Sequence, residues 1–220
     1  MLKQEVLVLG NLETNCYIIW DEETKEGLVI DPADDGVGIS EEIENKGIKL
    51  VGIVMTHGHF DHSLAALDLK LIYNVPVYLS NKDKFLLDRQ DETAKYFLKR
   101  DIKTPNLKEV DKDLEEIKEI NFGKSKLEVI KTPGHTPGSV CLYFKPTPTG
   151  RTSLKNGGLL FSGDTLFKDS RGRTDFKYAS TKKIYESLKK LMELPEDTEV
   201  YSGHGEATTI GREKERYIFD

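Results

Sequence analysis

The sequence predicts one α/β domain that spans residues 1–220. Short apolar runs rich in β-branched and aromatic residues alternate with amphipathic helical segments, which is typical of this class. No linker or low-complexity segment divides the chain, and its 220 residues suit a single hydrophobic core. One order of segments also occurs twice: a strand, then a strand with an acid at its end, then a strand that ends at a histidine.

The predicted strands are short apolar runs flanked by glycine, proline, asparagine or aspartate. In chain order they cover residues 5–9, 16–20, 28–30, 52–55, 76–79, 127–130, 140–144, 159–162 and 199–201. Residues 145–157 include two prolines and Gly150, so we expect a long exposed hairpin loop there. The charged run 108–119 is predicted to be a solvated surface.

Five helices are predicted, at residues 39–46, 62–73, 82–100, 180–194 and 210–217. The first has Ser40 near its start as an N-cap and stops at Gly47. Apolar residues recur at helical spacing in the second and fourth helices, and the fourth ends before Pro195. The third is mixed and amphipathic, and the last would add one or two turns at the C-terminus.

The repeated order of segments is consistent with two related halves that face each other. The first half runs through residues 16–20 to Asp31 and then to His57. The second runs through residues 140–144 to Asp164 and then to His204. An ordinary alternation of strands and helices explains the same order equally well, so both interpretations stay open.

Composition and charge exclude several classes of protein. Hydrophobic residues make up 37% and charged residues 32% of the chain, and the mean hydropathy is −0.48, which is typical of a soluble globular protein. The net charge of −6 makes nucleic acid or an anionic membrane an unsuitable partner. We find neither a transmembrane stretch nor a secretory signal, so the expected location is the cytoplasm. Cys16 and Cys141 have no CxxC spacing, and we expect inert buried thiols.

The five histidines are the residues that point to chemistry. His57, His59 and His62 lie within one window of seven residues, and His135 and His204 lie in separate turns that contain glycine. Each turn follows a predicted strand, and loops at strand ends along one sheet edge are where sites are usually built. A single histidine of this kind is more often a hydrogen-bonded structural residue. Five of them beside aspartates favour a metal site instead.

Imidazoles and carboxylates without a nearby cysteine suit zinc, iron or manganese. His57 and His59 are two residues apart, so both can face one ion, whereas Asp61 and His62 follow the turn and can face a second. Asp164 is the candidate for an anionic ligand that both ions share. The predicted ligands for two divalent ions, with positions left for water, are therefore His57, His59, Asp61, His62, His135, Asp164 and His204.

The run His-Gly-His-Phe-Asp-His at residues 57–62 resembles the HxHxDH signature of the metallo-β-lactamase superfamily. The resemblance covers nearly the whole chain and is closest to the short glyoxalase II-like, or hydroxyacylglutathione hydrolase-like, branch. Supporting motifs lie at residues 14–17, 30–32, 132–138, 163–167, 172–175 and 208–213. The resemblance implies an αββα sandwich of two mixed sheets with helices outside. It also implies one ion on His57, His59 and His135, a second on Asp61, His62 and His204, and Asp164 as the bridge.

The same resemblance implies a hydrolase of small acyl thioesters such as hydroxyacyl-glutathione, with a hydroxide activated by two divalent ions, zinc first among them. Asp61 and Asp164 are the expected catalytic residues, with Asp61 a ligand first and a proton shuttle second. Asp31, at a strand end, is the candidate for fixing the histidine tautomers.

Three further residues are predicted to bind the substrate. Arg171 and Arg173 could hold a substrate carboxylate, and Phe167 could wall the pocket, as could Phe60 and Tyr96. The competing interpretation of Arg173 is an internal ion pair with Asp175 or Asp169, and that of the aromatic residues is core packing.

Two other reactions stay open. The run Gly-Arg-Thr-Asp-Phe at residues 172–176 also resembles persulfide dioxygenases, which use one iron, and a lactonase is a further alternative. No cysteine lies near Asp164, which argues against a β-lactamase with a zinc–thiolate site. We also expect this chain to lack the C-terminal helical region with which full-length glyoxalase II enzymes hold glutathione, so the exact substrate stays open.

Overall fold

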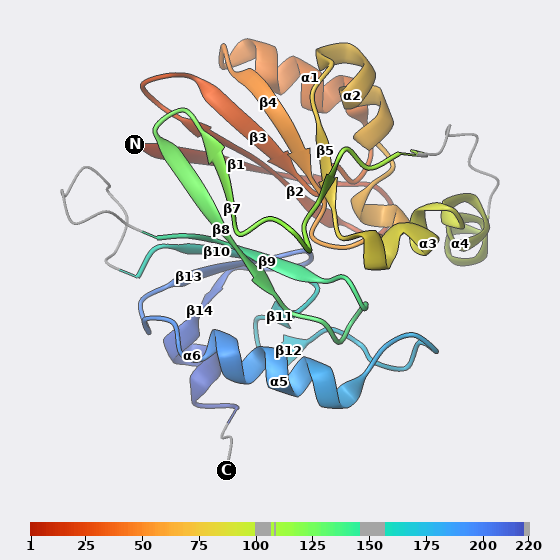
Figure 1. Ribbon diagram of the computed structural model, residues 1–220, viewed down its shortest axis with the longest axis vertical. Helices are drawn as coiled ribbons and strands as arrows, with labels where there is room; N and C mark the ends of the chain where they lie inside the picture. Colours follow the sequence, from red (N-terminus) through yellow and green to blue (C-terminus); the bar gives the residue numbers. More distant parts are fainter. Residues whose placement is uncertain (100–106, 108, 146–156, 218–220) are drawn as a thin grey trace.

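Two six-stranded mixed sheets pack face to face, with helices on both outer faces (Figure 1). The structure is a computed structural model that describes residues 1–99, 107, 109–145 and 157–217. Its four layers are the αββα sandwich that the resemblance implies, so the predicted fold class is confirmed. Among the described residues, no helix is both long enough and apolar enough to span a bilayer.

The first sheet contains the N-terminal half of the chain, and its strands follow one another in sequence order. The first three strands pair antiparallel and the others pair parallel, which makes the sheet mixed. The strands are β1 (Leu2–Leu9), β2 (Thr14–Asp21), β3 (Glu26–Ile30), β4 (Lys49–Val54), β5 (Val77–Leu79) and β6 (Lys112–Asp113).

The second sheet has the order β14-β13-β10-β9-β8-β7. Only the pair β10–β13 is parallel. The strands are β7 (Glu119–Phe122), β8 (Ser125–Lys131), β9 (Val140–Phe144), β10 (Leu159–Gly163), β13 (Glu199–Ser202) and β14 (Thr208–Thr209). A small hairpin of β11 (Leu166–Phe167) and β12 (Ser170–Arg171) follows β10.

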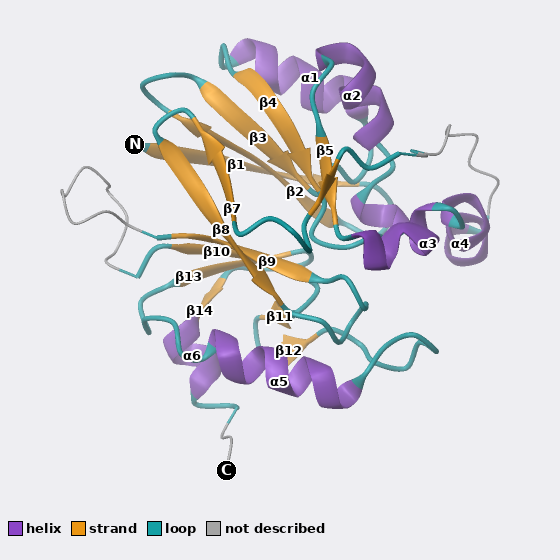
Figure 2. Cartoon of the chain, in the orientation of Figure 1, coloured by secondary structure: helices purple, strands orange, loops and turns teal. Residues whose placement is uncertain are grey.

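Helices cover the two outer faces (Figure 2). The helices α1 (Gly36–Asn45) and α2 (Ala66–Tyr73) lie over the first sheet, and α5 (Thr181–Leu191) and α6 (Ile210–Lys214) lie over the second. At one end of the sandwich follow the short turns η1 (Phe60–His62) and η2 (Asn81–Asp83) and the helices α3 (Lys84–Leu87) and α4 (Gln90–Leu98).

The central core lies between the sheets, where alternate side chains of facing strands meet. Phe161 on β10 is fully buried there and packs edge-on against Tyr17 on β2, with ring centroids 5.1 Å apart. Ile19 and Ile30 reach the same cluster from the first sheet and Phe122 reaches it from the second. This burial of large apolar side chains holds the two halves together and fixes how their loops meet.

The repeated order of segments in the sequence corresponds to a repeated topology. In the first half β2 pairs antiparallel with β3, which pairs parallel with β4, and α1 connects the parallel strands. In the second half β9, β10 and β13 repeat this arrangement, with α5 as the connecting helix. Asp31 and Asp164 directly follow the carboxyl ends of β3 and β10, and His57 and His204 come within three residues of the ends of β4 and β13.

All nine predicted strands are present, but the structure differs from the sequence prediction elsewhere. The single helix predicted at 82–100 is wrong, because Asp88 and Arg89 separate α3 from α4, and the turn η2 precedes α3. Leu87 packs into the cluster beneath α1 and α2, whereas Ala94 packs against Phe60, and one straight helix would not serve both. The second predicted helix begins at 66 instead of 62, and residue 100 lies outside the described residues.

The sequence prediction missed five short strands, β6, β7, β11, β12 and β14. Four of them have two residues, which is too short for a period-2 pattern. The charged run at 108–119 is not simply solvated, because Leu114 beside β6 is fully buried. Of the predicted loop 145–157, residues 146–156 lie outside the described residues.

Candidate metal centre

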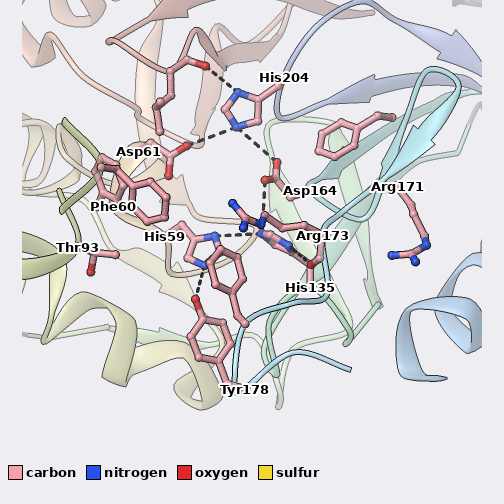
Figure 3. A pocket seen from close by; sticks show the side chains of 14 residues that line it. His59, Phe60, Asp61, Thr93, His135, Asp164, Arg171, Arg173, Tyr178 and His204 are labelled. Atoms are coloured by element: carbon pink, nitrogen blue, oxygen red, sulfur yellow. Dashed lines mark hydrogen bonds and ion pairs between the residues drawn. The ribbon is translucent and has the colours of Figure 1, made fainter. Parts of the chain in front are cut away.

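The seven predicted ligands all lie at one end of the sandwich, on segments that follow strands. Figure 3 shows His59, Asp61, His135, Asp164 and His204 among them. His57 and His59 follow β4, and η1 carries Asp61 and His62. The three others follow strands of the second sheet: His135 comes after β8, Asp164 after β10 and His204 after β13. The sandwich therefore brings together residues that are up to 147 positions apart in the sequence, from 57 to 204.

The ligand atoms form two adjoining groups that could each hold an ion, since the atoms within a group all lie within 4.8 Å of one another. One group consists of His57, His59, His135 and Asp164, and the other of Asp61, His62 and His204. A third combination of Asp31, His57 and His62 also meets this distance. This is the grouping that the resemblance implies, with Asp31 as an additional neighbour.

In the first group three imidazole nitrogens converge. His59 Nδ1 lies 2.9 Å from His57 Nε2 and 3.0 Å from His135 Nε2. The Oδ2 atom of Asp164 lies 3.4 Å from His135 Nε2. One hydrogen atom on His59 can satisfy only one of the two facing nitrogens, whereas a cation between them would satisfy all three.

In the second group His62 Nε2 and His204 Nε2 are 3.3 Å apart. Asp61 Oδ2 lies 3.6 Å from the first and 3.4 Å from the second of these nitrogens. The Oδ1 atom of Asp164 approaches the same nitrogens at 3.5 and 3.8 Å. Asp164 thus directs one carboxylate oxygen toward each group, as a shared ligand would.

The outer nitrogens of three histidines face oxygens that can only accept hydrogen bonds. His62 Nδ1 donates to Asp31 Oδ2 at 3.0 Å, His135 Nδ1 to the carbonyl of Arg173 at 2.9 Å, and His204 Nδ1 to that of Leu12 at 3.0 Å. A proton held on Nδ1 leaves the Nε2 lone pair of a neutral ring for a metal ion. The expected contact between Asp31 and a histidine of the site is present.

The two remaining histidines have side-chain partners. The Thr56 hydroxyl donates to Asp31 Oδ2 at 2.7 Å, so it accepts from His57 Nδ1 at 3.1 Å and leaves His57 Nε2 toward the group. His59 is reversed, because its Nδ1 faces the group and its Nε2 lies 2.8 Å from the Tyr178 hydroxyl. Sequence reasoning missed Thr56 and Tyr178, because neither belongs to a ligand-like spacing.

The pKa values of the histidines differ between the two groups. Burial, followed by the charges of neighbouring imidazoles, holds the pKa of His57 well below its usual value. Burial and His135 lower the pKa of His59 to about 3. Burial opposes protonation of His62 too, but the carboxylates of Asp164, Asp61 and Asp31 raise the pKa of His62 to about 10. The carboxylates therefore favour positive charge at His62, whereas burial disfavours it at His57 and His59.

One buried atom shows that the residues fit a metal ion. Asp164 Oδ1 is buried and has no hydrogen-bond partner among the described residues. A buried carboxylate oxygen without a partner is costly, and a coordinated cation removes that cost. Glycine at position 203 leaves space for this oxygen, because a Cβ atom there would lie 2.4 Å from it.

The last residue of β10, directly before Asp164, has to be glycine. Gly163 has a φ of +48°, a left-handed conformation that other residues rarely adopt, and a Cβ atom there would lie 2.3 Å from Thr56 Oγ1. This close approach joins the end of β10 to the end of β4. The shared carboxylate is consequently placed beside the histidines of the first sheet.

A cavity of about 420 Å³ opens over the metal centre. All three predicted substrate-binding residues, Arg171, Arg173 and Phe167, line it. Tyr96 does not line it and is exposed instead. Five of the predicted ligands form its floor, and the remaining lining residues are Leu12, Phe60, Thr93, Phe97, Phe176 and Tyr178.

The ion pair that competed with a substrate role for Arg173 is present. Its guanidinium donates to both carboxylate oxygens of Asp175, at 2.7 and 2.6 Å. Arg171 instead donates to the Gly172 carbonyl and lies over the ring of Tyr185, at 5.0 Å from its centroid. No carboxylate of the described residues pairs with Arg171.

A site rich in imidazoles at one end of a four-layer αββα sandwich is typical of metallo-hydrolases. The chain belongs to the Metallo-beta-lactamase superfamily, whose family model matches residues 9–204. The matched range contains all seven predicted ligands.

Curated relatives share nearly the full length of the chain. It is 33% identical to the probable metallo-hydrolase YqgX of Bacillus subtilis (strain 168), over 99% of this chain and 97% of that protein. It is also 33% identical to the hydroxyacylglutathione hydrolase GloC of Haemophilus influenzae, over 96% of this chain and 94% of that protein.

Solved structures agree with the fold over a similar range. The crystal structure of the BLEG-1 B3 metallo-beta-lactamase matches with a TM-score of 0.84 and 33% identity, covering 97% of each chain. That of TTHA1623 in a di-iron-bound form matches with a TM-score of 0.79 and 34% identity, covering 95% of this chain and 96% of the other.

Proposed function

We propose that this protein is a metal-dependent thioester hydrolase that acts on small acyl thioesters of the hydroxyacyl-glutathione type. The observation that carries the proposal is the position of Asp164, whose two oxygens face two separate groups of imidazoles. An arrangement with a shared carboxylate suits two adjacent ions. The similarity to a relative named hydroxyacylglutathione hydrolase supports this substrate class.

The proposed cofactors are two divalent ions, with zinc as the first choice and iron or manganese as alternatives. His57, His59 and His135 would hold one ion, Asp61, His62 and His204 would hold the other, and Asp164 would bridge them. When bound, such ions would lower the pKa of a water molecule to about 7 and polarise a carbonyl oxygen. A di-iron form is known for one structure with this fold, so iron belongs in the test.

The chain's own residues would position the substrate and handle its protons. Asp61 lies at the cavity floor, where the Thr14 hydroxyl donates to Oδ2 at 3.3 Å, and we assign to it the transfer of a proton from the attacking water. The cavity walls would exclude bulk water from the thioester carbonyl. Because a thiolate is a good leaving group, no strong general acid is required. The proposed location is the cytoplasm.

Two alternative reactions have specific support. The run at 172–176, which resembles persulfide dioxygenases, borders the cavity through Arg173 and Phe176, and such an enzyme would use one iron. The second alternative is β-lactam hydrolysis, because the chain is similar in structure to a B3 metallo-beta-lactamase. A lactonase activity is tested in the same panel, because a lactone presents a similar acyl carbon.

The experiment combines elemental analysis with a substrate panel on the purified protein. Two metal ions per chain and hydrolysis of acyl thioesters are expected. Replacing Asp164 or His59 by Ala should remove metal and reduce hydrolysis by at least about 100-fold, as expected when a group essential to the site is lost. Asp88→Ala is the matched control, because Asp88 is exposed, pairs with Lys84 and does not line the cavity.

Three outcomes would overturn the proposal. The first is one iron per chain together with oxygen uptake on glutathione persulfide, which would assign a dioxygenase instead. The second is turnover confined to lactones or β-lactams. The third is unchanged thioester hydrolysis by a metal-depleted Asp164→Ala protein.

A further inference from the structure

Two pairs of aromatic rings wall the cavity above the metal centre. On the side of η1 and α4, the rings of Phe60 and Phe97 stack at 6.0 Å with an interplanar angle of 20°. In the loop before α5, the rings of Phe176 and Tyr178 stack at 5.3 Å and 17°. Figure 3 shows Phe60 and Tyr178 on different sides of His59. A group that enters the cavity therefore meets ring surfaces from more than one direction.

Most polar groups of these walls already have a partner, and the exception is the Arg171 guanidinium, which pairs with no carboxylate of the described residues. The Arg173 guanidinium is already paired with Asp175 and lies over the Phe176 ring, 4.5 Å from its centroid. The Thr93 hydroxyl donates to the Arg89 carbonyl in its own helix. The carboxylates that line the cavity, Asp61 and Asp164, belong to the metal centre. The walls thus offer apolar and aromatic surface above a polar floor.

We propose that the cavity selects thioesters whose acyl group carries an apolar ring, such as phenylacetyl, over those with a small polar acyl group such as lactoyl. This inference rests on the proposed thioester hydrolysis and names its acyl class. Aromatic rings gain stability from burial and from offset or edge-to-face contacts with other rings. A volume of about 420 Å³ lies within the range of cavities that enclose small molecules.

The test compares thioesters of one thiol, N-acetylcysteamine, that carry acetyl, lactoyl or phenylacetyl groups. Phenylacetyl is expected to exceed acetyl and lactoyl in kcat/KM by more than about 10-fold, the discrimination that extra apolar contacts usually give. Phe97→Ala should lower kcat/KM for the phenylacetyl thioester more than for the acetyl thioester, and so remove most of this preference. Tyr96→Ala is the matched control, because Tyr96 is the adjacent aromatic residue of α4 but does not line the cavity.

The outcomes separate this inference from the proposed function. Equal turnover of the three thioesters, or loss of preference in Tyr96→Ala as much as in Phe97→Ala, would overturn the acyl preference and leave the hydrolase standing. If no thioester is cleaved, calorimetric binding of phenylacetate, lactate and acetate tests the cavity alone. Phenylacetate that binds no more tightly than the other two would then refute the preference.

An independent observation concerns Asp83, a fully buried carboxylate that is not one of the proposed ligands. Its Oδ2 accepts from the backbone N–H of Gly58 at 3.1 Å and from the Thr136 hydroxyl at 2.5 Å. Its Oδ1 accepts from the backbone N–H of Gly138 at 2.7 Å. No Lys or Arg of the described residues pairs with it, so these neutral donors stabilise the carboxylate.

These donors belong to the two loops that carry the three histidines of the first group, His57, His59 and His135. Gly58 lies between His57 and His59, and Thr136 follows His135. Both loops press against η2, because a Cβ atom on Gly58 would lie 2.7 Å from the Asp83 carbonyl oxygen, and one on Gly138 would lie 2.8 Å from the Asp83 Cγ atom. We infer that Asp83 is a positioning residue that sets the spacing of the first group of imidazoles without touching a metal ion or a substrate.

The test uses Co²⁺, whose visible absorption reports the geometry of its ligands. In Asp83→Asn one carboxylate oxygen becomes an NH₂ group that faces N–H or O–H donors. We expect Co²⁺ to bind about 10-fold more weakly or worse, the usual effect of losing a residue that supports metal ligands, with altered visible bands. Asp21→Asn is the matched control, because Asp21 is also a buried carboxylate, held by Thr24 and Ser125 in another part of the fold.

A lower melting temperature in both variants is expected and decides nothing by itself. The inference requires that the spectrum and affinity change in Asp83→Asn alone. If the Co²⁺ spectrum and affinity of Asp83→Asn match those of Asp21→Asn, Asp83 serves only stability and the inference is overturned.

Discussion

Replacing Asp31 by Asn should change the tautomer of a metal ligand. The Asp31 carboxylate accepts from the Thr56 N–H at 2.7 Å, from the Thr56 hydroxyl at 2.7 Å and from His62 Nδ1 at 3.0 Å. Its backbone has a φ of 51°, which asparagine tolerates as well as aspartate does, so the backbone can stay as it is. The substitution therefore alters the hydrogen-bonding pattern and removes one negative charge, without a change of the backbone.

The amide can satisfy only part of this pattern. If its oxygen keeps the bond from the Thr56 N–H, its NH₂ group faces His62 Nδ1, and His62 must move its proton to Nε2, where a metal ion would bind. If the amide flips, its NH₂ group faces the buried Thr56 N–H, which costs about 1–3 kcal/mol. The first case should weaken metal binding by about 10- to 100-fold, as for other partners of ligating histidines. That factor corresponds to about 1.4–2.7 kcal/mol.

The assay is a chelator-competition titration with Zn²⁺, accompanied by urea unfolding of the metal-free protein. Asp35→Asn is the control, because it makes the same charge change at an exposed N-cap where asparagine serves equally well. If Asp31→Asn binds Zn²⁺ within about twofold of Asp35→Asn, the tautomer argument is wrong, since a loss of 10-fold or more is required.

Three further predictions address the rest of the molecule. Removing metal with a chelator should lower the melting temperature, and restoring it at 100 times its Kd should add about 2.7 kcal/mol of stability; a melting temperature independent of metal would contradict this. Phe161→Ala should lower the free energy of unfolding, measured with urea, by about 3–5 kcal/mol, because it leaves a cavity in the core between the sheets. A loss no larger than that of an ordinary surface substitution would refute this prediction. Burial raises the pKa of Asp21, but hydrogen bonds from Thr24 and Ser125 outweigh it and lower that pKa below 3.8. The stability that Asp21 contributes is thus present above pH 3.8 and is lost as the pH falls further. The free energy of unfolding, measured with urea at several pH values, should fall less in acid for Asp21→Asn than for the unchanged protein.

The sequence predicted which side chains gather at the site because their pattern is local. His57, His59, Asp61 and His62 lie in one short run, and the other three lie in turns at strand ends, so spacing alone marked them. Asp31 was predicted in the same way, as an acid at a strand end, and its bond to His62 is present. What these residues bind stays a prediction.

Residues that act from outside the motifs were not predictable. Asp83 lies in a polar segment that resembles an exposed helix, and only the packing of two distant loops makes it a buried acceptor. Phe176 and Tyr178 follow the Gly-Arg-Thr-Asp run without any spacing that marks a pocket wall. The helix expected at 82–100 is broken because its parts pack on different clusters, which local propensity does not encode.

The sequence by itself determined the α/β class, the strands and the identity of the side chains that gather at the site, because each depends on periodicity or on spacing along a few residues. The tertiary structure alone decided that Asp164 lies between two groups of imidazoles and that aromatic rings enclose the cavity above them. Those contacts join residues of both sheets. Their distances are set by how the two sheets pack, which no stretch of sequence specifies alone.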